Sequence, residues 1–309
     1  MHLLRRKGFT LIELVVALVI LGIVSGAIYK VLLTNQQTYT AQTQGIDLQQ
    51  NLRAGAALLP AEFRELNAVG DAIGAAGDIA GMTATSVSIR AMRQVAFLCV
   101  TPPLGGGGQI PLTIRQQPIY GSKQTFAVGD SVLVFYEGSV TTRNDDSWLS
   151  GKVTKVDTGT CPDSTNGLST PHAAYVLTLQ PHWIVGSQLN IPGAITNGSP
   201  VRGFTSTVYG LYLSSSDNRY YVGQSVAGSA MQPLIGPLSG ANGLQFVYYD
   251  STGTGTTTDS SKVAMIEIHL YEATAARVRQ ATSAGVNYKI DSLVTRVSLR
   301  NNPRCGPCF

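Results

Sequence analysis

The hydrophobic and polar positions divide the chain into an N-terminal part with helical periodicity and a longer part with strand periodicity. From Phe9 to Tyr29 the only charged residue is Glu13, and these 21 residues would span about 31 Å as a helix, near the thickness of a bilayer core. Beyond Lys30 one apolar stripe continues at helical spacing. It consists of Leu48, Leu52, Ala56, Leu59, Phe63 and Leu66. The pattern predicts one helix over residues 9–66, membrane-embedded over about 9–30 and packed on a globular body further on.

Small residues and one proline modify this predicted helix. Gly22 and Gly26 form a small-xxx-small pair, which permits close approach of another helix and weakens the helix locally. Pro60 is expected to bend or interrupt the helix, because proline lacks a backbone N–H and its ring clashes with the preceding turn.

The remaining chain, residues 67–309, predicts a β-rich body. Residues 70–83 are rich in Gly and Ala and predict a loop, after which the apolar pattern changes to period two. The expected strands are Ser86–Arg90, Val95–Thr101, Ser131–Tyr136, Lys152–Asp157, Ala174–Leu179, Ser206–Leu213, Tyr220–Val222, Leu244–Tyr249, Val263–Tyr271 and Ser292–Leu299. The predicted fold class is therefore α+β, with one long helix packed on a large, mainly antiparallel β body.

Composition and charge narrow the class of protein further. Only 13% of the 309 residues are charged, which is typical of an exported β-rich protein rather than a cytosolic enzyme. The formal charge is +4, but beyond residue 7 there are 19 basic and 18 acidic side chains, a balance of +1. A near-neutral body argues against generic nucleic-acid binding, which needs a clustered basic surface.

Four cysteines, Cys99, Cys161, Cys305 and Cys308, permit two disulfides in an exported chain, with three possible pairings. The three-residue spacing favours Cys305 with Cys308, which leaves Cys99 with Cys161. The sequence Cys305-Gly306-Pro307-Cys308 has the form of a thioredoxin motif, but only Phe309 follows it, so no helix can lower the thiol pKa. A disulfide in the tail is favoured over redox catalysis.

The carboxylate of Glu13 is the feature that an ordinary membrane anchor does not explain. An ionised carboxylate inside hydrocarbon is costly, so such a residue has a partner or a function. A signal peptide cleaved after the apolar run is one alternative, with Val24 and Gly26 before the cut, but it explains neither Glu13 nor the continuing helix. A glutamate that reaches the headgroups from the end of the helix is another.

The segment Lys7-Gly8-Phe9-Thr10-Leu11-Ile12-Glu13-Leu14 resembles the processing motif of type IV prepilins and type II secretion pseudopilins. In that family a prepilin peptidase cleaves after the glycine and methylates the new N-terminal amine. The resemblance implies cleavage after Gly8, N-methylation of Phe9 and a role in assembly for Glu13. The amine and the carboxylate could pair within one chain or between subunits, which offsets their desolvation. The leader, residues 1–8, would be removed. Its cations, Arg5, Arg6 and Lys7, hold the N-terminus in the cytoplasm before cleavage.

The size of the chain and parts of its body resemble large minor pilins of the PilW type and J pseudopilins. These stretches are residues 128–134, 232–250 and 296–301. Pilins often carry proline at mature position 22, where this chain has Lys30. The resemblance implies a minor pilin of a type IV pilus, at the tip or in priming of assembly. Its partners would be the prepilin peptidase, other pilin subunits and the inner membrane before assembly, with an extracellular or periplasmic filament as its destination. The alternatives are a J-like pseudopilin of type II secretion and a tip module for adhesion or DNA uptake.

Other constellations favour structural interpretations, and the sequence predicts no catalytic residue, metal site or cofactor. The histidines, His2, His172, His182 and His269, lack metal-ligand spacing, and His269 on an alternating strand predicts a surface or interstrand residue. Asp250 and Asp259 could hold calcium, but a solvated loop is favoured over that reading. Strand packing explains the tyrosines at 220, 221, 248 and 249 as well as an exposed aromatic surface does.

Overall fold

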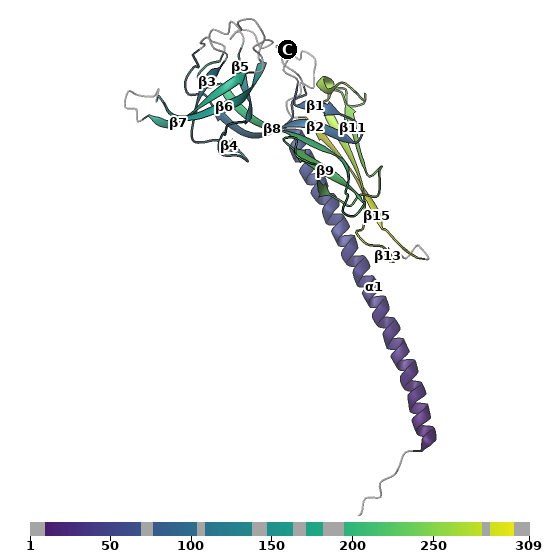
Figure 1. The fold of residues 1–309 in the computed structure, drawn as a ribbon. Coiled ribbons are helices and arrows are strands. Elements are labelled where there is room, and N and C mark those ends of the chain that lie inside the picture. Colours follow the sequence, from purple (N-terminus) through teal and green to yellow (C-terminus); the bar gives the residue numbers. More distant parts are fainter. Residues whose placement is uncertain are drawn as a thin grey trace, which may run out of the picture.

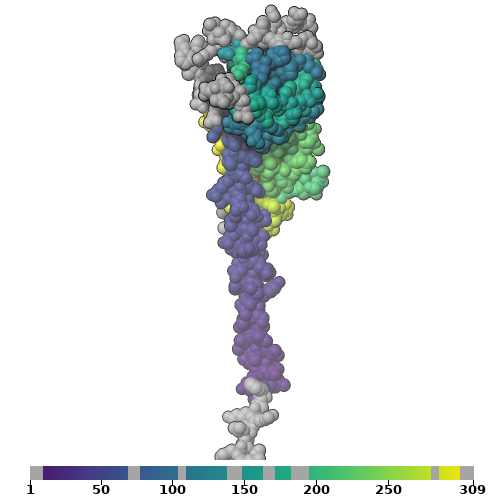
Figure 2. Space-filling view, turned by 90° about the vertical axis from the view of Figure 1, so that its left-hand side faces the viewer, coloured from purple at the N-terminus to yellow at the C-terminus, as the bar shows by residue number. Residues whose placement is uncertain are grey.

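The computed structural model describes residues 10–68, 77–103, 109–137, 147–162, 171–181, 195–279 and 285–299. One long helix, α1 (Leu11–Arg64), carries the β body at its C-terminal end, and its N-terminal half stands free of that body (Figures 1 and 2). This helix is long and apolar enough to cross a membrane, judged by length and composition. The combination of one N-terminal helix with an antiparallel β body confirms the predicted α+β class.

The C-terminal half of α1 packs on the body through the predicted stripe. Leu52, Leu59 and Phe63 are all buried, whereas the large apolar residues between Leu11 and Leu33 are exposed. The ring of Phe63 makes edge-to-face contacts with Tyr209 and Phe246, at centroid distances of 5.8 and 5.9 Å. Aromatic contacts of this kind add to the free energy gained from burial. The body therefore holds α1 by its second half alone.

Pro60 does not interrupt α1, which contradicts one of the two effects predicted for it. The helix continues to Arg64, and Pro60 itself is buried against the body. A proline inside a helix costs one backbone hydrogen bond, and burial of the surrounding apolar stripe offsets that loss. Glu62, two residues further on, forms an ion pair with Arg93 at 2.9 Å.

The described residues of the body form three antiparallel sheets. The largest has the order β1-β2-β8-β5-β6-β7-β3, with β4 on β2, and with β9 on β8 and β10 on β9. The second has the order β11-β12-β15, and the third pairs β13 with β14. The strands are β1 Ile79–Met82, β2 Ser86–Phe97, β3 Ile110–Arg115, β4 Tyr120–Gly121, β5 Ser131–Tyr136, β6 Ser147–Cys161, β7 His172–Pro181, β8 Pro200–Leu213, β9 Tyr220–Val226, β10 Gln232–Ile235, β11 Leu244–Tyr249, β12 Met265–Ala273, β13 Val278–Arg279, β14 Val286–Asn287 and β15 Ile290–Ser298. A short 3₁₀ helix, η1 (Ser260–Lys262), precedes β12.

Part of the large sheet closes on itself to form a barrel. Strands β2, β8, β5, β6, β7 and β3 pair in that order, and β3 returns to the chain that continues from β2. The closure consists of a bridge between Leu98 and Ile114 and a hydrogen bond of 3.0 Å from the N–H of Cys99 to the carbonyl of Thr113. Closure removes the exposed edges that an open sheet would present.

The described part of the body has two large hydrophobic cores, besides a small apolar cluster at the Cys99–Cys161 disulfide. One lies between α1 and the strands of the second sheet, and includes Leu59, Phe63 and Ile268. The other fills the barrel, includes Leu112, Val134 and Leu177, and contains no residue of α1. The long strands β2 and β8 pass from one core to the other, so the barrel is a lobe joined to the helix-bearing part by continuous strands (Figure 1).

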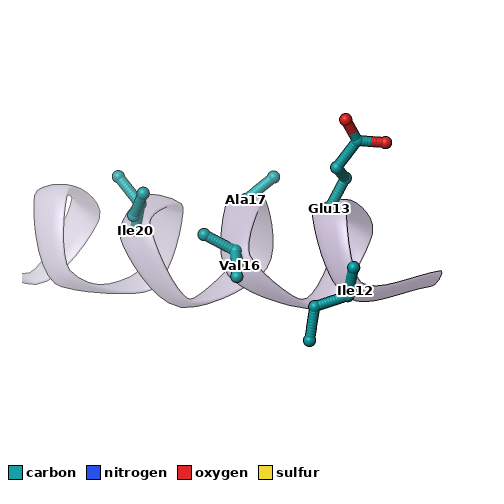
Figure 3. Close-up of a pocket in the computed structure, with 5 residues that line it drawn as sticks. All are labelled: Ile12, Glu13, Val16, Ala17 and Ile20. Atoms are coloured by element: carbon teal, nitrogen blue, oxygen red, sulfur yellow. The ribbon is translucent and has the colours of Figure 1, made fainter. Parts of the chain in front are cut away.

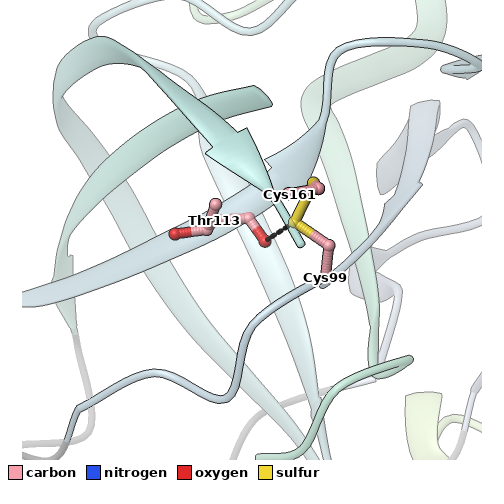
Figure 4. Close-up of a disulfide and its surroundings, with 3 residues drawn as sticks. All are labelled: Cys99, Thr113 and Cys161. Carbon is pink, nitrogen blue, oxygen red and sulfur yellow. Dashed lines mark hydrogen bonds between the residues drawn. A yellow bond between two sulfur atoms is a disulfide. The ribbon is translucent and has the colours of Figure 1, made fainter. Parts of the chain in front are cut away.

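A disulfide between Cys99 and Cys161 lies where the barrel closes (Figure 4). This pairing was favoured from the sequence and is confirmed, whereas Cys305 and Cys308 lie outside the described residues. The carbonyl oxygen of Thr113 lies 3.5 Å from the sulfur of Cys99. The bond links residues 62 positions apart, and in the loop-entropy model such a link stabilises the fold by about 4 kcal/mol.

Six of the described strands lie where the sequence did not predict a strand: β1, β3, β4, β10, β13 and β14. Strand β1 occupies part of the predicted loop at 70–83, so the loop prediction is wrong for Ile79–Met82; this segment pairs with β2 despite Gly81. Strand β3 was missed because Pro111 lowers strand propensity. Strand β3 pairs along its whole length with β7, but it contacts the chain after β2 only at Thr113 and Ile114. Pro111 lies outside that second contact, so the structure accommodates its missing N–H.

The two strands predicted at 86–90 and 95–101 are one strand, β2, which has an irregularity between Met92 and Gln94. Strands β5 and β11 have the predicted bounds.

Candidate functional site

The N-terminus of α1 carries a reciprocal capping box formed by Thr10 and Glu13. The backbone N–H and the hydroxyl of Thr10 donate to Oε2 of Glu13 at 2.9 and 3.0 Å, and the N–H of Glu13 donates to the hydroxyl of Thr10 at 3.4 Å. This arrangement satisfies backbone groups that a helix N-terminus leaves without partners. The sequence therefore places an anionic acceptor, Glu13, four residues after Phe9, in the first turn of the helix.

Apolar side chains surround this carboxylate along the helix. Ile12, Val16, Ala17 and Ile20 line a shallow, open groove with Glu13, whose carboxylate points away from the helix (Figure 3). The groove lies on the surface of a single helix, so the structure leaves it open to other molecules. A cation placed here would meet one carboxylate in apolar surroundings, where charge pairing is strong.

The two glycines predicted to favour helix approach lie on the exposed part of α1. A Cβ at Gly22 or Gly26 would meet nothing within 4 Å. Nothing in the fold of the single chain therefore requires glycine at either position. The helix is continuous through Lys30, the position at which pilins often have proline.

The remaining residues of the processing motif lie outside the described part of the chain. These are Arg5, Arg6, Lys7, Gly8 and Phe9. Their roles remain predictions.

The structure gives structural roles to the carboxylates considered for calcium. Asp250 accepts from the N–H of Thr252 at 2.9 Å, and Asp259 accepts from the N–H of Ser261 at 3.0 Å. Hydrogen bonds from Thr252 and from Ser261 lower the pKa of these two carboxyl groups. Each aspartate thus stabilises its own turn. Among the described residues, no group of three or more His, Cys, Asp or Glu side chains is placed to hold a metal ion.

His269 lies on β12, between β11 and β15, and takes part in a charged cluster that the sequence did not predict. Its Nε2 is 2.7 Å from Oε1 of Glu267, whose other oxygen accepts from Arg296. Burial alone would raise the pKa of Glu267, but the hydrogen bonds from Arg296 and His269 outweigh it and lower this pKa. In the sequence, only the two-residue spacing of Glu267 and His269 indicated that these two side chains lie on the same face of a strand. That Arg296 of β15 lies opposite Glu267 of β12 depends on the register of the two strands, which the sequence does not give.

Tyr248 is buried, and its hydroxyl donates to the carbonyl oxygens of Thr83 and Ser86, at 3.0 and 3.2 Å. It therefore packs inside the body and is not part of an exposed aromatic surface.

Glu272 is a buried carboxylate that the sequence analysis missed. It is 0% exposed, lies on β12 opposite Asp291 of β15, and neither of its carboxylate oxygens has a hydrogen-bond partner. Burial raises its pKa to about 7. The neutral, protonated acid is therefore favoured in the folded protein over a wider pH range than in the unfolded chain.

We expect Glu272→Gln to remove a pH dependence of stability. Because the folded pKa is raised, the stabilising protonation is complete below the unfolded pKa of about 4.5 and is lost as the pH rises to about 7. The wild-type protein should lose about 3 kcal/mol of unfolding free energy between pH 4 and pH 8 from this group. Urea unfolding in detergent should show the Gln variant more stable than wild type at pH 8. Asp157→Asn, an exposed strand carboxylate, is the control. Equal pH profiles for wild type and Glu272→Gln would contradict this assignment.

A comparison with known protein families finds a match to the N-terminal part of the chain. Residues 3–29 match the family described as "Prokaryotic N-terminal methylation motif". With the exposed apolar helix and the antiparallel body, the match supports a structural, non-enzymatic subunit of the type IV pilin or pseudopilin kind. The motif implies processing by a prepilin peptidase and assembly with other pilin subunits. The apolar helix fits anchoring in the inner membrane before assembly. No curated protein and no solved structure matches the chain.

Proposed function

We propose that this chain is a large minor pilin of the PilW type, a structural subunit of a type IV pilus. The observation that carries the proposal is the exposed carboxylate of Glu13 at the start of an apolar helix whose other half is fixed to the body. Cleavage after Gly8 would leave a cationic amine at Phe9, which becomes N-methylated. The leader would be residues 1–8, the helix 9–66 and the extracytoplasmic body 67–309.

Assembly in this proposal depends on the free half of α1. Large apolar side chains are exposed from Leu11 to Leu33, and this surface needs either lipid or other helices around it. Before assembly the helix spans the inner membrane with its N-terminus in the cytoplasm. In the filament it packs against other pilin helices, with Gly22 and Gly26 allowing close approach. Glu13 then sets register by pairing with the amine of a neighbouring subunit.

A place at the filament tip is supported by the position of the barrel. The barrel lies beyond the C-terminal end of α1, the end remote from the membrane (Figure 1). A lobe at that position would face outwards from a growing filament. A J-like pseudopilin of type II secretion would use the same helix and the same chemistry, so it remains the alternative, as does a tip module that binds a surface or DNA.

The test is the intact mass and N-terminal residue of the chain recovered from sheared filaments. We expect the chain to begin at N-methylated Phe9 and to lack the mass of residues 1–8. Recovery with secretion-dependent filaments alone would favour the pseudopilin alternative. A chain that still carries its leader inside assembled filaments would contradict the proposal.

A further inference from the structure

A small basic surface lies beside α1 where the helix leaves the body. The segment 273–290 contains Arg277, Arg279 and Lys289 and no Asp or Glu, and α1 between residues 14 and 46 contains Lys30 as its only charged residue. Arg277 and Arg279 are exposed, and Lys289 is half-buried. We call Arg277, Arg279 and Lys289 the basic collar. Near-neutral composition of the body as a whole hides this local concentration of positive charge.

Contacts with α1 fix the height of the basic collar along the helix. Nη1 of Arg279 donates to the side-chain oxygen of Gln37 at 3.2 Å, and the N–H of Ala276 donates to the side-chain oxygen of Gln44 at 3.0 Å. The ammonium group of Lys289 lies beside Gly45, where it would be 3.6 Å from an added Cβ. The collar is thus held against residues 37–45 of the helix, and β13 is the labelled strand nearest the free half of α1 (Figure 1).

This height coincides with the headgroup layer of a bilayer that α1 crosses. The exposed apolar residues of α1 continue past the predicted span of about 9–30 to Leu33, so we place the end of the bilayer core at Leu33. Gln37 follows Leu33 by four residues, about 6 Å along the helix axis. The headgroup layer on each side of a bilayer core is about 5–7 Å thick. Arg279 therefore contacts α1 at the depth where phosphate groups lie.

The apolar and aromatic residues around the collar suit the same environment. Val286, Tyr288 and Ile290 are exposed on the same end of the body, and Tyr39 is exposed on the helix. Tyr288 lies between two cations, with the guanidinium carbons of Arg219 and Arg277 at 4.9 and 5.6 Å from its ring centroid. Tyrosine and basic residues together are typical of protein surfaces at the membrane interface.

Arg219 holds the collar in place from the body. It donates to the carbonyl oxygens of Thr274 and Ala275 at 2.9 and 2.7 Å. The segment that carries Arg277 is thereby fixed at both sides, by Arg219 and by Gln44 of α1. The cations are positioned before any ligand arrives, which lowers the entropic cost of binding.

We propose that the basic collar binds the headgroups of anionic phospholipids while the chain is anchored in the membrane, before it enters a filament. This inference rests on membrane anchoring by α1, as in the proposed function. Binding orients the body on the bilayer and holds the free helix upright. Entry into a filament then requires the collar to leave the lipid, so lipid charge opposes extraction of the subunit.

The test measures how strongly a nitroxide on the lipid headgroup quenches a fluorophore attached to the protein, with the full chain inserted in nanodiscs. The fluorophore is attached to the cysteine of Asn287→Cys, in a chain whose Cys305 and Cys308 are replaced by serine. We expect quenching to be about threefold or more stronger when half of the phosphatidylcholine is replaced by phosphatidylglycerol, since each cation near an anionic surface raises binding about fivefold. High salt should remove the difference. Size-exclusion chromatography separately reports whether the chain inserted, so failure of anchoring is distinguished from failure of lipid binding.

Matched variants test whether the lipid-dependent quenching depends on the charge of the basic collar or on the shape of its side chains. Replacing Arg277, Arg279 and Lys289 by serine should return quenching to the level in neutral lipid, whereas Arg277→Lys with Arg279→Lys should preserve it. Removing Arg115, Lys152 and Lys155 from the barrel, an equal number of charges, should have no effect. Equal quenching in neutral and anionic lipid would overturn the proposal, as would cross-linking of residue 287 to another pilin subunit without any lipid-dependent quenching.

Discussion

Glu13→Val should leave membrane insertion and leader cleavage intact and reduce incorporation into filaments by about 100-fold or more. In the proposed filament the amine at Phe9 would then be buried without its partner. Removing one member of a buried ion pair costs roughly 3–5 kcal/mol, which corresponds to a factor of about 10² to 5 × 10³ in an equilibrium constant. The measurement is the amount of the variant in sheared filaments relative to the membrane fraction.

The capping box offers a second explanation for any effect of Glu13, and Thr10→Val separates the two. Glu13 accepts two hydrogen bonds from Thr10, so it also stabilises the N-terminus of its own helix. Loss of a helix cap costs about 1 kcal/mol, or about fivefold. If Glu13 pairs with the amine of another chain, Thr10→Val should reduce incorporation only modestly. Equal losses for Thr10→Val and Glu13→Val would show that capping accounts for the whole effect.

Asp47→Val is the matched control for Glu13, because it removes an exposed carboxylate from the part of the same helix that lies beside the body. It should leave incorporation close to wild type. Normal incorporation of Glu13→Val would refute the assembly role.

Gly8→Phe should leave the leader attached and block maturation completely. A peptidase cleft that admits backbone at the scissile bond has no room for a large side chain, and glycine is the residue that allows such close approach. The variant should keep residues 1–8 and an unmethylated N-terminus in mass spectrometry, remain in the membrane and be missing from filaments.

Gly26→Ala is the control for a glycine substitution in the same segment. A Cβ at Gly26 meets nothing within 4 Å in the single chain, and alanine favours the helix. Its leader should be removed as in wild type. Mature mass in Gly8→Phe would show that the cleavage site is elsewhere.

Local patterns predicted the helix well, because its determinants lie within a few residues of one another. Apolar residues at helical spacing predicted that Leu52, Leu59 and Phe63 face the body, and all three are buried. The helix was predicted over residues 9–66 and is observed over Leu11–Arg64. Strands with clean alternation, β5 and β11, were also predicted with their bounds.

The barrel could not be predicted in the same way, because strand pairing joins segments far apart in the sequence. The spacing between strands carries no information about whether β3 returns to β2, and Pro111 obscures β3 itself. The sequence favoured the pairing of Cys99 with Cys161 by the spacing of the cysteines, but it did not indicate that this disulfide lies where the barrel closes. Glu272 illustrates the same limit, since its alternating strand does not reveal that the fold leaves its carboxylate fully buried and without a hydrogen-bond partner.

The sequence by itself determined the membrane-length helix, the apolar stripe that docks it and the unusual acid at its start, because each depends on short-range spacing and residue chemistry. Only the tertiary structure decided that the body has two large cores, that the barrel closes at Cys99, and that Arg277, Arg279 and Lys289 lie close together beside α1. Those features depend on contacts between residues distant in the sequence, from 14 positions for Cys99 and Thr113 to 242 for Gln37 and Arg279. Such contacts arise when loop closure and burial of apolar surface act on the whole chain.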